Sequence, residues 1–358
     1  MHTQHVIDAE TLSAFAADIF QGKRIPSMVA SVVAQSLVLA NLKGHDSHGI
    51  IRVIDYIQWL ENGWLDPTGE LEVLQDSVGL LRVDGHYQFG QVIARQATTL
   101  ALDKTDQDGF CLLTIRRSGH FGRIGEFMEM AAERDIVSLF LTNTHGGGVL
   151  AAPHGGCQPR LSANPIGGGA RLRNGQHLVM DFATCIIAEG KLKVARAKGQ
   201  KVKPGCIING KGEPTVDPEE YYGDPPGAIL PIAEHKGYAL ALFADIFAGA
   251  IAGGSCSKSD ASRIANGGFA IFVKPAAFCG RAFFDEQVGE LASWIKTCKP
   301  AQGFDEVLLP GEPEAQAFAQ RSVHGIPVDQ TTWTKLRGIA ESLSVRIPIV
   351  REDQHVTI

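Results

Sequence analysis

The chain opens with apolar residues that recur at helical spacing. Residues 8–20 begin with Asp8, a residue type that caps helix N-termini, and residues 27–42 end just before Gly44. Residues 48–62 carry isoleucine and leucine along one face. The pattern therefore predicts three helices in the N-terminal part of the chain.

From about residue 75 onward, short apolar runs alternate with segments of helical periodicity. This alternation predicts an α/β lobe whose sheet is partly parallel. The predicted strands are residues 79–83, 110–115, 137–142, 177–182 and 269–273, and the predicted helices are residues 90–105, 123–134, 187–198, 236–252, 284–297 and 330–343.

One apolar segment, residues 237–254, approaches the length that spans a membrane. It carries Asp245 near its centre and is rich in glycine and alanine, so a buried helix is the better interpretation. The N-terminus lacks a basic region followed by an apolar stretch, so no signal peptide is expected. Seven scattered cysteines without a C-x-x-C pair favour a reducing compartment, and we expect a cytoplasmic protein.

Composition narrows the class of function. The 358 residues are 44% hydrophobic and 20% charged, which allows a large buried core. The net charge of −6 does not suit a nucleic-acid binder or a polybasic membrane-surface protein. Forty glycines, more than average, cluster in loops where backbone can approach a ligand closely. We therefore expect an enzyme that acts on a small molecule.

The first candidate site follows the second predicted helix. Asp46 or Ser47 can cap the third predicted helix, which places His48 in its first turn and Arg52 on the same face. A helix N-terminus attracts anions, arginine binds a carboxylate with two parallel bonds, and histidine moves a proton near neutral pH. The pattern suits a small carboxylate whose neighbouring oxygen changes protonation. The alternative is a capping histidine beside a solvated arginine.

Further candidates lie where predicted strands end. Residues 118–125 form a glycine-rich loop in which His120 and Arg123 can meet a charged ligand, or a packed turn. Asp181 ends an apolar run, where it orients a catalytic histidine or caps a helix. Lys236 begins the apolar helix, where it favours a phosphate or carboxylate, or is solvated.

Several familiar motifs are absent from the sequence. It contains no G-x-G-x-x-G fingerprint, no phosphate-binding G-x-x-x-x-G-K-[ST] loop, no G-x-S-x-G elbow and no H-E-x-x-H. His45 and His48 have metal-like spacing, but no further ligands complete a set, so no metal is predicted. The residues alone thus indicate an α/β protein with a carboxylate site and do not identify a reaction.

A series of motifs, taken in order, is more specific. They are residues 46–49 with Arg52, residues 118–122, 164–165, 181–184, 190–191 and 235–238, and the segments ANLKGHDSHGI, PGC, AEHKGYALA and LLPGE. Together they resemble the malate/L-lactate dehydrogenase family, which comprises NAD(P)H-dependent 2-oxoacid reductases without a Rossmann fold. The resemblance covers essentially the whole chain.

The resemblance implies a homodimer with a non-Rossmann α/β fold. Residues 1–75 would form an N-terminal helical segment that carries the His48 and Arg52 site. Residues 76–300 would form a central mixed-sheet nucleotide-binding lobe. Residues 301–358 would form a C-terminal helical segment that packs back on the N-terminal part.

The resemblance also implies reversible hydride transfer between a nicotinamide cofactor and a 2-oxo or 2-hydroxy acid. We expect NAD in preference to NADP. His48 would exchange a proton with the substrate oxygen beside the nicotinamide, and Arg52 would bind the substrate carboxylate. His120 would line the pocket, and Asp181 would support the protonation network. Besides His48, the implied cofactor contacts are Gly122, Arg123, Ile124, Leu178, Val179, Met180, Asp181, Phe182, His235, Lys236, Asn266, Gly311 and Glu312.

The substrate is left open. Relatives often carry asparagine at the position of Arg117, whose guanidinium would bind a second acidic group on the substrate or face solvent. Within the family, a cyclic imino acid reductase would use the same histidine to protonate nitrogen. Outside the family, the alternatives are a metal-dependent lyase or hydrolase built on His45, His48 and His120, and a non-catalytic binding protein.

Overall fold

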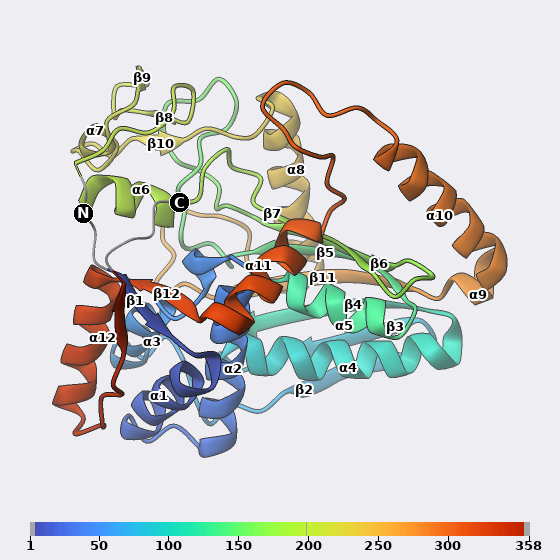
Figure 1. The fold of residues 1–358 in the computed structure, drawn as a ribbon, viewed down its shortest axis with the longest axis horizontal. Helices are drawn as coiled ribbons and strands as arrows, with labels where there is room; N and C mark the ends of the chain where they lie inside the picture. The colour runs from blue at the N-terminus through green and yellow to red at the C-terminus, as the bar shows by residue number, and fades with distance from the viewer. Residues whose placement is uncertain (1–3, 198, 354–358) are drawn as a thin grey trace.

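A seven-stranded sheet runs through the computed structural model, which describes residues 4–197 and 199–353 (Figure 1). Only its second and third strands pair in parallel, and the other neighbouring strands are antiparallel. The predicted α/β class with a mixed sheet is confirmed. In spatial order the strands are β2 (Glu72–Ser77), β3 (Leu80–Asp84), β4 (Phe110–Ser118), β11 (Asn266–Val273), β5 (Val137–Asn143), β6 (Ile166–Arg171) and β7 (His177–Phe182).

Helices and two smaller three-stranded sheets surround this central sheet. The helices are α1 (Ala9–Gly22), α2 (Ser27–Leu42), the 3-10 helix η1 (Asp46–His48), α3 (Arg52–Glu61), α4 (Gly90–Asp108), α5 (Gly125–Glu133), α6 (Glu189–Ala197), α7 (Pro218–Tyr221), α8 (His235–Asp245), the π-helix η2 (Ile246–Ile251), α9 (Pro275–Phe278), α10 (Arg281–Lys296), α11 (Glu312–His324) and α12 (Gln330–Ser342). The smaller sheets contain β1 (Gln4–Ile7), β12 (Ile326–Asp329) and β13 (Arg351–Asp353), and β8 (Ile207–Ile208), β9 (Pro214–Thr215) and β10 (Ala228–Ile229).

Helices cover both faces of the central sheet. Neighbouring residues of a strand point to opposite faces. A Cβ on Gly267 of β11 would lie 2.0 Å from the backbone oxygen of Ala248 in η2. A Cβ on Gly268 would instead meet Phe121 and Phe140, which belong to the core beneath α4 and α5. The α8–η2 segment therefore covers the face opposite to α4 and α5.

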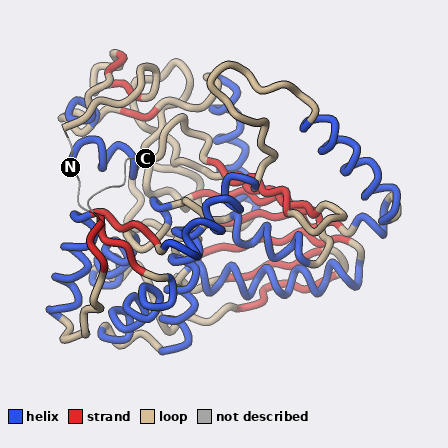
Figure 2. Tube along the Cα trace, in the orientation of Figure 1, coloured by secondary structure: helices blue, strands red, loops and turns tan. Residues whose placement is uncertain are grey.

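The two ends of the described chain meet in one small sheet. β1 lies between β12 and β13 and pairs antiparallel with both (Figure 2). Beside it, the N-terminal helices and α12 share one core that contains Phe20, Leu37, Tyr56, Ile326 and Trp333. C-terminal elements thus pack on the helices that precede the central sheet. The division into three segments stays a prediction.

The predicted start of the third helix, near residue 48, is wrong. α3 begins at Arg52, and His48 belongs to the separate turn η1 instead of the first turn of this helix. No side chain caps α3. The reason is Asn41 of α2, whose Oδ1 accepts from the backbone N–H of Ile50 at 2.7 Å and whose Nδ2 donates to Asp46 at 2.6 Å. Asn41 thereby takes the Ile50 N–H that a cap at Ser47 would bind. The first N–H groups of α3 donate instead to the backbone oxygens of Gly49, Ile50 and Ile51.

Sequence analysis missed β6, whose sequence IGGGAR carries little strand signal. A Cβ on Gly169 would lie 2.6 Å from the backbone oxygen of Met128, and one on Gly167 would lie 3.1 Å from Ile124. Met128 belongs to α5, and Ile124 is the residue that precedes this helix. The glycines therefore let α5 lie directly on the strand, at the expense of the β-branched residues that mark strands.

The apolar helix predicted at residues 236–252 forms α8 and η2, but it is buried on one side only. Its small residues Ala244 and Ala248 are fully buried, whereas Leu240, Phe243 and Ile251 are 42%, 58% and 55% exposed. The prediction of a buried helix therefore holds for the face that packs on the sheet. Within the described residues, no helix is both long enough and apolar enough to cross a membrane.

Candidate active site

Two histidines from distant parts of the chain stack on each other. His48 ends η1, whereas His120 lies in the loop between β4 and α5. Their ring centroids are 5.7 Å apart with an interplanar angle of 14°, and both residues are partly exposed. His48 Nδ1 lies 3.1 Å from Ser47 Oγ. The structure thus brings together two residues that the sequence pointed to separately.

Arg52 supplies a positive charge beside these rings. Its Nε donates to the backbone oxygen of Ser47 at 2.7 Å, and its Nη1 donates to Asp55 at 2.8 Å. Its Nη2 makes no hydrogen bond with the residues that the structure describes, so a free N–H pair is left for a ligand. This geometry suits a carboxylate, which guanidinium groups bind with charge-assisted hydrogen bonds.

Both histidines are neutral at pH 7. Burial and the nearby Arg52 charge hold the pKa of His48 well below its usual range. The same two causes lower the pKa of His120 to about 3. An anion bound at Arg52 offsets the second cause, so it is expected to raise the pKa of both rings.

Three residues that sequence analysis missed enclose His120. Tyr56 Oη lies 2.9 Å from His120 Nδ1, and Gln91 Nε2 donates to Tyr56 Oη at 2.7 Å. The Trp59 ring meets His120 nearly edge-on, with centroids 6.1 Å apart. The sequence spacing could have predicted two of them, because Tyr56 and Trp59 follow Arg52 by four and seven residues and so share its face of α3.

Asp181 lies in β7 and accepts a hydrogen bond from the backbone N–H of Gly125 at 2.7 Å. It therefore sits at the N-terminus of α5, where a carboxylate is favourable. Burial raises the pKa of Asp181. Among the described residues it makes no hydrogen bond with His48 or His120. Its part in the protonation network stays a prediction.

Arg117 binds a buried carboxylate. Its Nε donates to both oxygens of Asp84 at 2.9 Å, and Arg116 donates to the same group at 2.6 Å. The Asp84 side chain is 0% exposed. Burial alone would raise the pKa of Asp84, but the hydrogen bonds from Arg117, the His86 backbone and Arg116 lower it. The predicted contact between Arg117 and the substrate stays a prediction.

This geometry makes Arg117 a contributor to stability. We expect Arg117→Ala to lower the free energy of unfolding by about 1–3 kcal/mol. This loss is smaller than that for a buried carboxylate with one partner, because Arg116 still binds Asp84 in the variant. Differential scanning calorimetry measures the change. Arg82→Ala, which removes a 3.3 Å hydrogen bond between exposed side chains, is the control and is expected to change stability by less than about 0.5 kcal/mol. Equal melting temperatures for Arg117→Ala and wild type would contradict this role.

Five of the fourteen predicted cofactor contacts are residues of β7, which is one of the two edge strands of the sheet. The backbone N–H of Val179 donates to Pro310 at 3.1 Å, and a Cβ on Gly311 would lie 2.8 Å from the backbone oxygen of His177. The segment that precedes α11 therefore lies on the strand formed by His177, Leu178, Val179, Met180, Asp181 and Phe182. Ile124, next to Gly125, reaches the neighbouring strand β6.

The other predicted cofactor contacts are engaged within the protein or lie on its surface. Arg123 is 2% exposed and pairs with Glu129 through two hydrogen bonds of 3.0 and 3.1 Å. Asn266 accepts from the backbone of Phe121 at 2.8 Å and so holds the His120 loop. In the same loop, Gly122 has a φ of +75°, which favours glycine. Glu312 accepts from Gln176 and Lys296, and His235 and Lys236 are exposed at the first turn of α8.

Two buried polar atoms close to β7 lack hydrogen-bond partners within the described chain. They are Arg123 Nε, a donor, and Glu314 Oε2, an acceptor. In addition to the effect of burial, the Arg123 charge lowers the pKa of Asp181 and the Glu314 charge raises it, so both side chains lie within electrostatic range of this carboxyl group. Hydroxyl groups donate and accept hydrogen bonds, and the ribose of a dinucleotide carries them. The unpaired atoms therefore fit a nucleotide at this edge of the sheet.

α11 holds the loop that carries His48. His45 lies 3.2 Å from Glu314, and Arg321 binds the carboxylate of Asp46 with contacts of 2.6 and 3.0 Å. Since the segment before α11 lies on β7, this one helix connects the predicted cofactor strand to the loop that carries His48.

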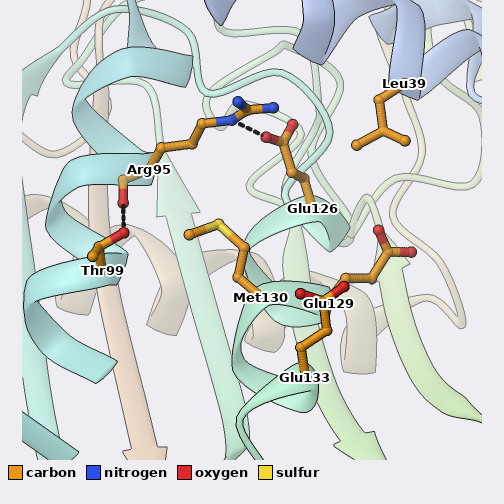
Figure 3. Close-up of a pocket in the computed structure, with 7 residues that line it drawn as sticks. All are labelled: Leu39, Arg95, Thr99, Glu126, Glu129, Met130 and Glu133. Carbon is orange, nitrogen blue, oxygen red and sulfur yellow. Dashed lines mark hydrogen bonds and ion pairs between the residues drawn. The ribbon is translucent and has the colours of Figure 1, made fainter. Parts of the chain in front are cut away.

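A separate hollow of about 350 Å³ lies between α2, α4 and α5 (Figure 3). Most of its charged groups are paired, since Arg95 binds Glu126 and Glu129 binds Lys43 and Arg123, whereas Glu133 makes no ion pair with the described residues. The stacked histidines do not line it. Its lining residues are Leu39, Arg95, Thr99, Glu126, Glu129, Met130 and Glu133.

Comparison with known proteins gives a consistent family. A sequence profile for malate/L-lactate dehydrogenase matches residues 7–337. L-lactate dehydrogenase of Cupriavidus necator is 35% identical over 337 residues, which are 93% of this chain and 96% of that protein. Hydroxycarboxylate dehydrogenase B of Escherichia coli is 33% identical over 350 residues, which are 96% of both chains.

Solved structures agree with the sequence comparison. An E. coli protein assigned to the malate/lactate dehydrogenases superposes with a TM-score of 0.91 at 33% identity and covers 96% of each chain. A delta1-piperideine-2-carboxylate reductase from Pseudomonas syringae superposes with a TM-score of 0.82 at 29% identity, with coverage of 94% of this chain and 99% of that one. The chain therefore belongs to the malate/L-lactate dehydrogenase family.

Proposed function

We propose that this protein is a nicotinamide-dependent oxidoreductase that reversibly reduces a 2-oxo carboxylic acid to the 2-hydroxy acid. The observation that carries the proposal is the stacked pair of His48 and His120 beside the free N–H groups of Arg52. Such a site binds a carboxylate and exchanges a proton with the oxygen next to it. Membership of a family of dehydrogenases supports the same reaction.

Each residue of the site has a defined task. Arg52 binds the substrate carboxylate, which places the 2-oxo group at the histidine pair. His48 gives a proton to the carbonyl oxygen during reduction and takes it back from the hydroxyl group during oxidation. Because the bound carboxylate offsets the charge of Arg52, it raises the pKa of His48 when a proton is needed. A reduced nicotinamide cofactor, when bound, would supply the hydride.

NADH is proposed in preference to NADPH. The unpaired acceptor near β7 belongs to a carboxylate, Glu314, and a second carboxylate, Asp181, lies within electrostatic range of it. Carboxylates accept hydrogen bonds from ribose hydroxyl groups and repel an added phosphate. Titration with each reduced cofactor, followed by nicotinamide fluorescence, tests the preference, which tighter binding of NADPH would contradict.

The reaction is tested by following the oxidation of NADH and NADPH with a panel of 2-oxo acids, with and without a metal chelator. The panel contains pyruvate, hydroxypyruvate, phenylpyruvate, glyoxylate, oxaloacetate and one cyclic imino acid. Turnover of at least one 2-oxo acid, unaffected by chelator, is the expected result. Chelator-sensitive activity that does not depend on the reduced cofactor would instead identify a metal-dependent lyase or hydrolase.

A second candidate is the reduction of a cyclic imino acid. It is favoured by the structural similarity to the Pseudomonas syringae reductase. The site accommodates this reaction as well, because His48 would protonate an imine nitrogen in place of a carbonyl oxygen. Turnover of the imino acid together with no turnover of any 2-oxo acid would select this candidate.

A homodimer and a cytoplasmic location are further parts of the proposal. The free cysteines support a reducing compartment. The exposed apolar side chains of α8 and η2 support association, since monomers rarely expose such patches. α10, drawn along the edge of the molecule in Figure 1, buries only Ala292 and exposes Phe283, Leu291 and Trp294.

The dimer can be tested on α8. We expect light scattering to give twice the chain mass for wild type, and Phe243→Asp to weaken association by at least about tenfold, because a charge at a buried apolar contact is costly. Val78→Asp is the control. Val78 is also apolar and 80% exposed, but it lies in the turn between β2 and β3. A monomeric wild type, or a Phe243→Asp variant that associates normally, would contradict the proposal.

A further inference from the structure

A chain of hydrogen bonds runs from the protein interior to His120. Gln91 Nε2 lies 2.7 Å from Tyr56 Oη, and Tyr56 Oη lies 2.9 Å from His120 Nδ1. Gln91 is 0% exposed and Tyr56 is 1% exposed, so water does not compete for these bonds. The chain ends at the ring that stacks on His48.

The orientation of the Gln91 amide determines which atom is the donor in each hydrogen bond of this chain. Gln91 Oε1 is buried without a partner in the described part of the chain. The opposite orientation would bury an unpaired NH₂ group at the same place. Burying unpaired N–H donors is rarer and costlier than leaving one carbonyl oxygen unpaired. Gln91 therefore donates to Tyr56, and the single proton of Tyr56 points to His120 Nδ1.

Charge states agree with this direction. Burial raises the pKa of Tyr56 far above its usual value, so the hydroxyl keeps its proton. Burial and Arg52 keep His120 neutral. A neutral imidazole that accepts a hydrogen bond at one nitrogen carries its proton on the other. That nitrogen, Nε2, makes no hydrogen bond with any residue that the structure describes, and His120 is partly exposed.

We propose that Tyr56 and Gln91 are positioning residues that hold His120 as the neutral Nε2–H tautomer, so that His120 donates a fixed hydrogen bond to the substrate while His48 moves the proton. The inference rests on the proposed function for its substrate, but not for the tautomer. A donor that is already oriented stabilises the negative charge that develops on the substrate oxygen without reorganising during the reaction.

The two histidines differ in the hydrogen-bond partner of Nδ1. Among the described residues, the only hydrogen-bond partner of His48 Nδ1 is the Ser47 hydroxyl, a group that rotates and can donate or accept. His48 can bind a proton or release it without breaking a buried hydrogen-bond chain. Protonation of His120 at Nδ1 would instead displace the hydrogen bond from Tyr56. Proton transfer thus belongs to His48, and hydrogen-bond donation belongs to His120.

The tautomer is measured directly by ¹⁵N NMR of the histidine rings in the ligand-free protein, with His120→Gln used to assign the His120 signal. Near neutral pH, wild type is expected to show an unprotonated Nδ1 and a protonated Nε2 on His120. Tyr56→Phe is expected to populate both tautomers and to raise the pKa of His120, because a hydrogen bond to the neutral ring is lost. A protonated Nδ1 in wild type would overturn the proposal.

A second variant covers the case in which Tyr56→Phe does not fold. Gln91→Met keeps the side-chain volume and leaves Tyr56 in place, but removes the donor to Tyr56. The hydroxyl can then donate to His120 or accept from it, so both tautomers are expected. A single Nε2–H tautomer that persists in Gln91→Met would remove Gln91 from the proposal.

Kinetics separate donation from proton transfer. Gln places an amide N–H near the position of Nε2 and does not titrate, whereas Leu has no donor. We expect His120→Leu to lose about 10²–10³-fold in kcat, the usual loss for one such donor, and His120→Gln to stay within about tenfold of wild type. Equal losses in both variants would overturn the donor role. Failure of wild type to reduce any 2-oxo or imino acid would overturn the proposed function, and the NMR result would still decide on the tautomer.

Discussion

Replacement of His48 by alanine is expected to lower kcat by roughly 10²–10⁴-fold, the usual contribution of a positioned acid or base. The affinity for the reduced cofactor is expected to stay within about tenfold of wild type, because the ring is only one contact of a large ligand. Steady-state kinetics with the best substrate of the panel, together with fluorescence titration of the cofactor, measure the two effects separately.

His45→Ala is the matched control for His48→Ala. His45 belongs to the same loop, but its imidazole points to Glu314, which is 3.2 Å away, and not to His120. Its loss removes one of the contacts with α11, while Arg321 still binds Asp46. We expect less than a tenfold change in kcat. Near-normal turnover by His48→Ala would remove this residue from the mechanism, and equal losses in both variants would indicate a disordered loop.

Local chemistry explains what could be predicted from the sequence. His48 and Arg52 were identified from residue types that suit a carboxylate and from a shared helix face, but the structure places them on the separate elements η1 and α3. The position of the helix was wrong because Asn41, on another helix, satisfies the backbone between them. The strand at residues 177–182 was predicted with its observed bounds because Leu178, Val179 and Met180 form a short apolar run at its centre.

The stacked pair could not be predicted in the same way. His48 and His120 meet because η1 and the loop after β4 pack together, and no periodicity reports such a contact. Tyr56 and Gln91 were missed because neither residue type by itself indicates a site. Only their hydrogen bonds to each other and to His120 indicate a function. The contacts of Arg123 with Glu129 and of Asn266 with the Phe121 backbone could not be predicted either, because only the fold brings these residues together, and their contacts with a cofactor stay a prediction.

Arg52→Ala is expected to raise the KM of the 2-oxo acid by roughly 10²-fold with a smaller change in kcat, since it removes charge-assisted hydrogen bonds that substrate and transition state share. Asp55→Asn is the control, because it leaves the guanidinium in place and alters only the partner of Nη1. An unchanged KM in Arg52→Ala would show that the carboxylate binds elsewhere.

The pH profile of kcat/KM gives Arg52 a second, independent signature. The Arg52 charge is one cause of the low pKa of His48, and a positive neighbour disfavours the imidazolium. Arg52→Ala removes that charge, so the pKa of His48 rises and the corresponding limb of the profile moves to higher pH. Arg52→Lys keeps the charge but loses the planar fork, and it is expected to keep the low pKa while KM stays raised. A profile that does not move in Arg52→Ala would mean that burial alone sets the pKa of His48, and a normal KM in Arg52→Lys would mean that charge, and not paired hydrogen bonds, binds the acid.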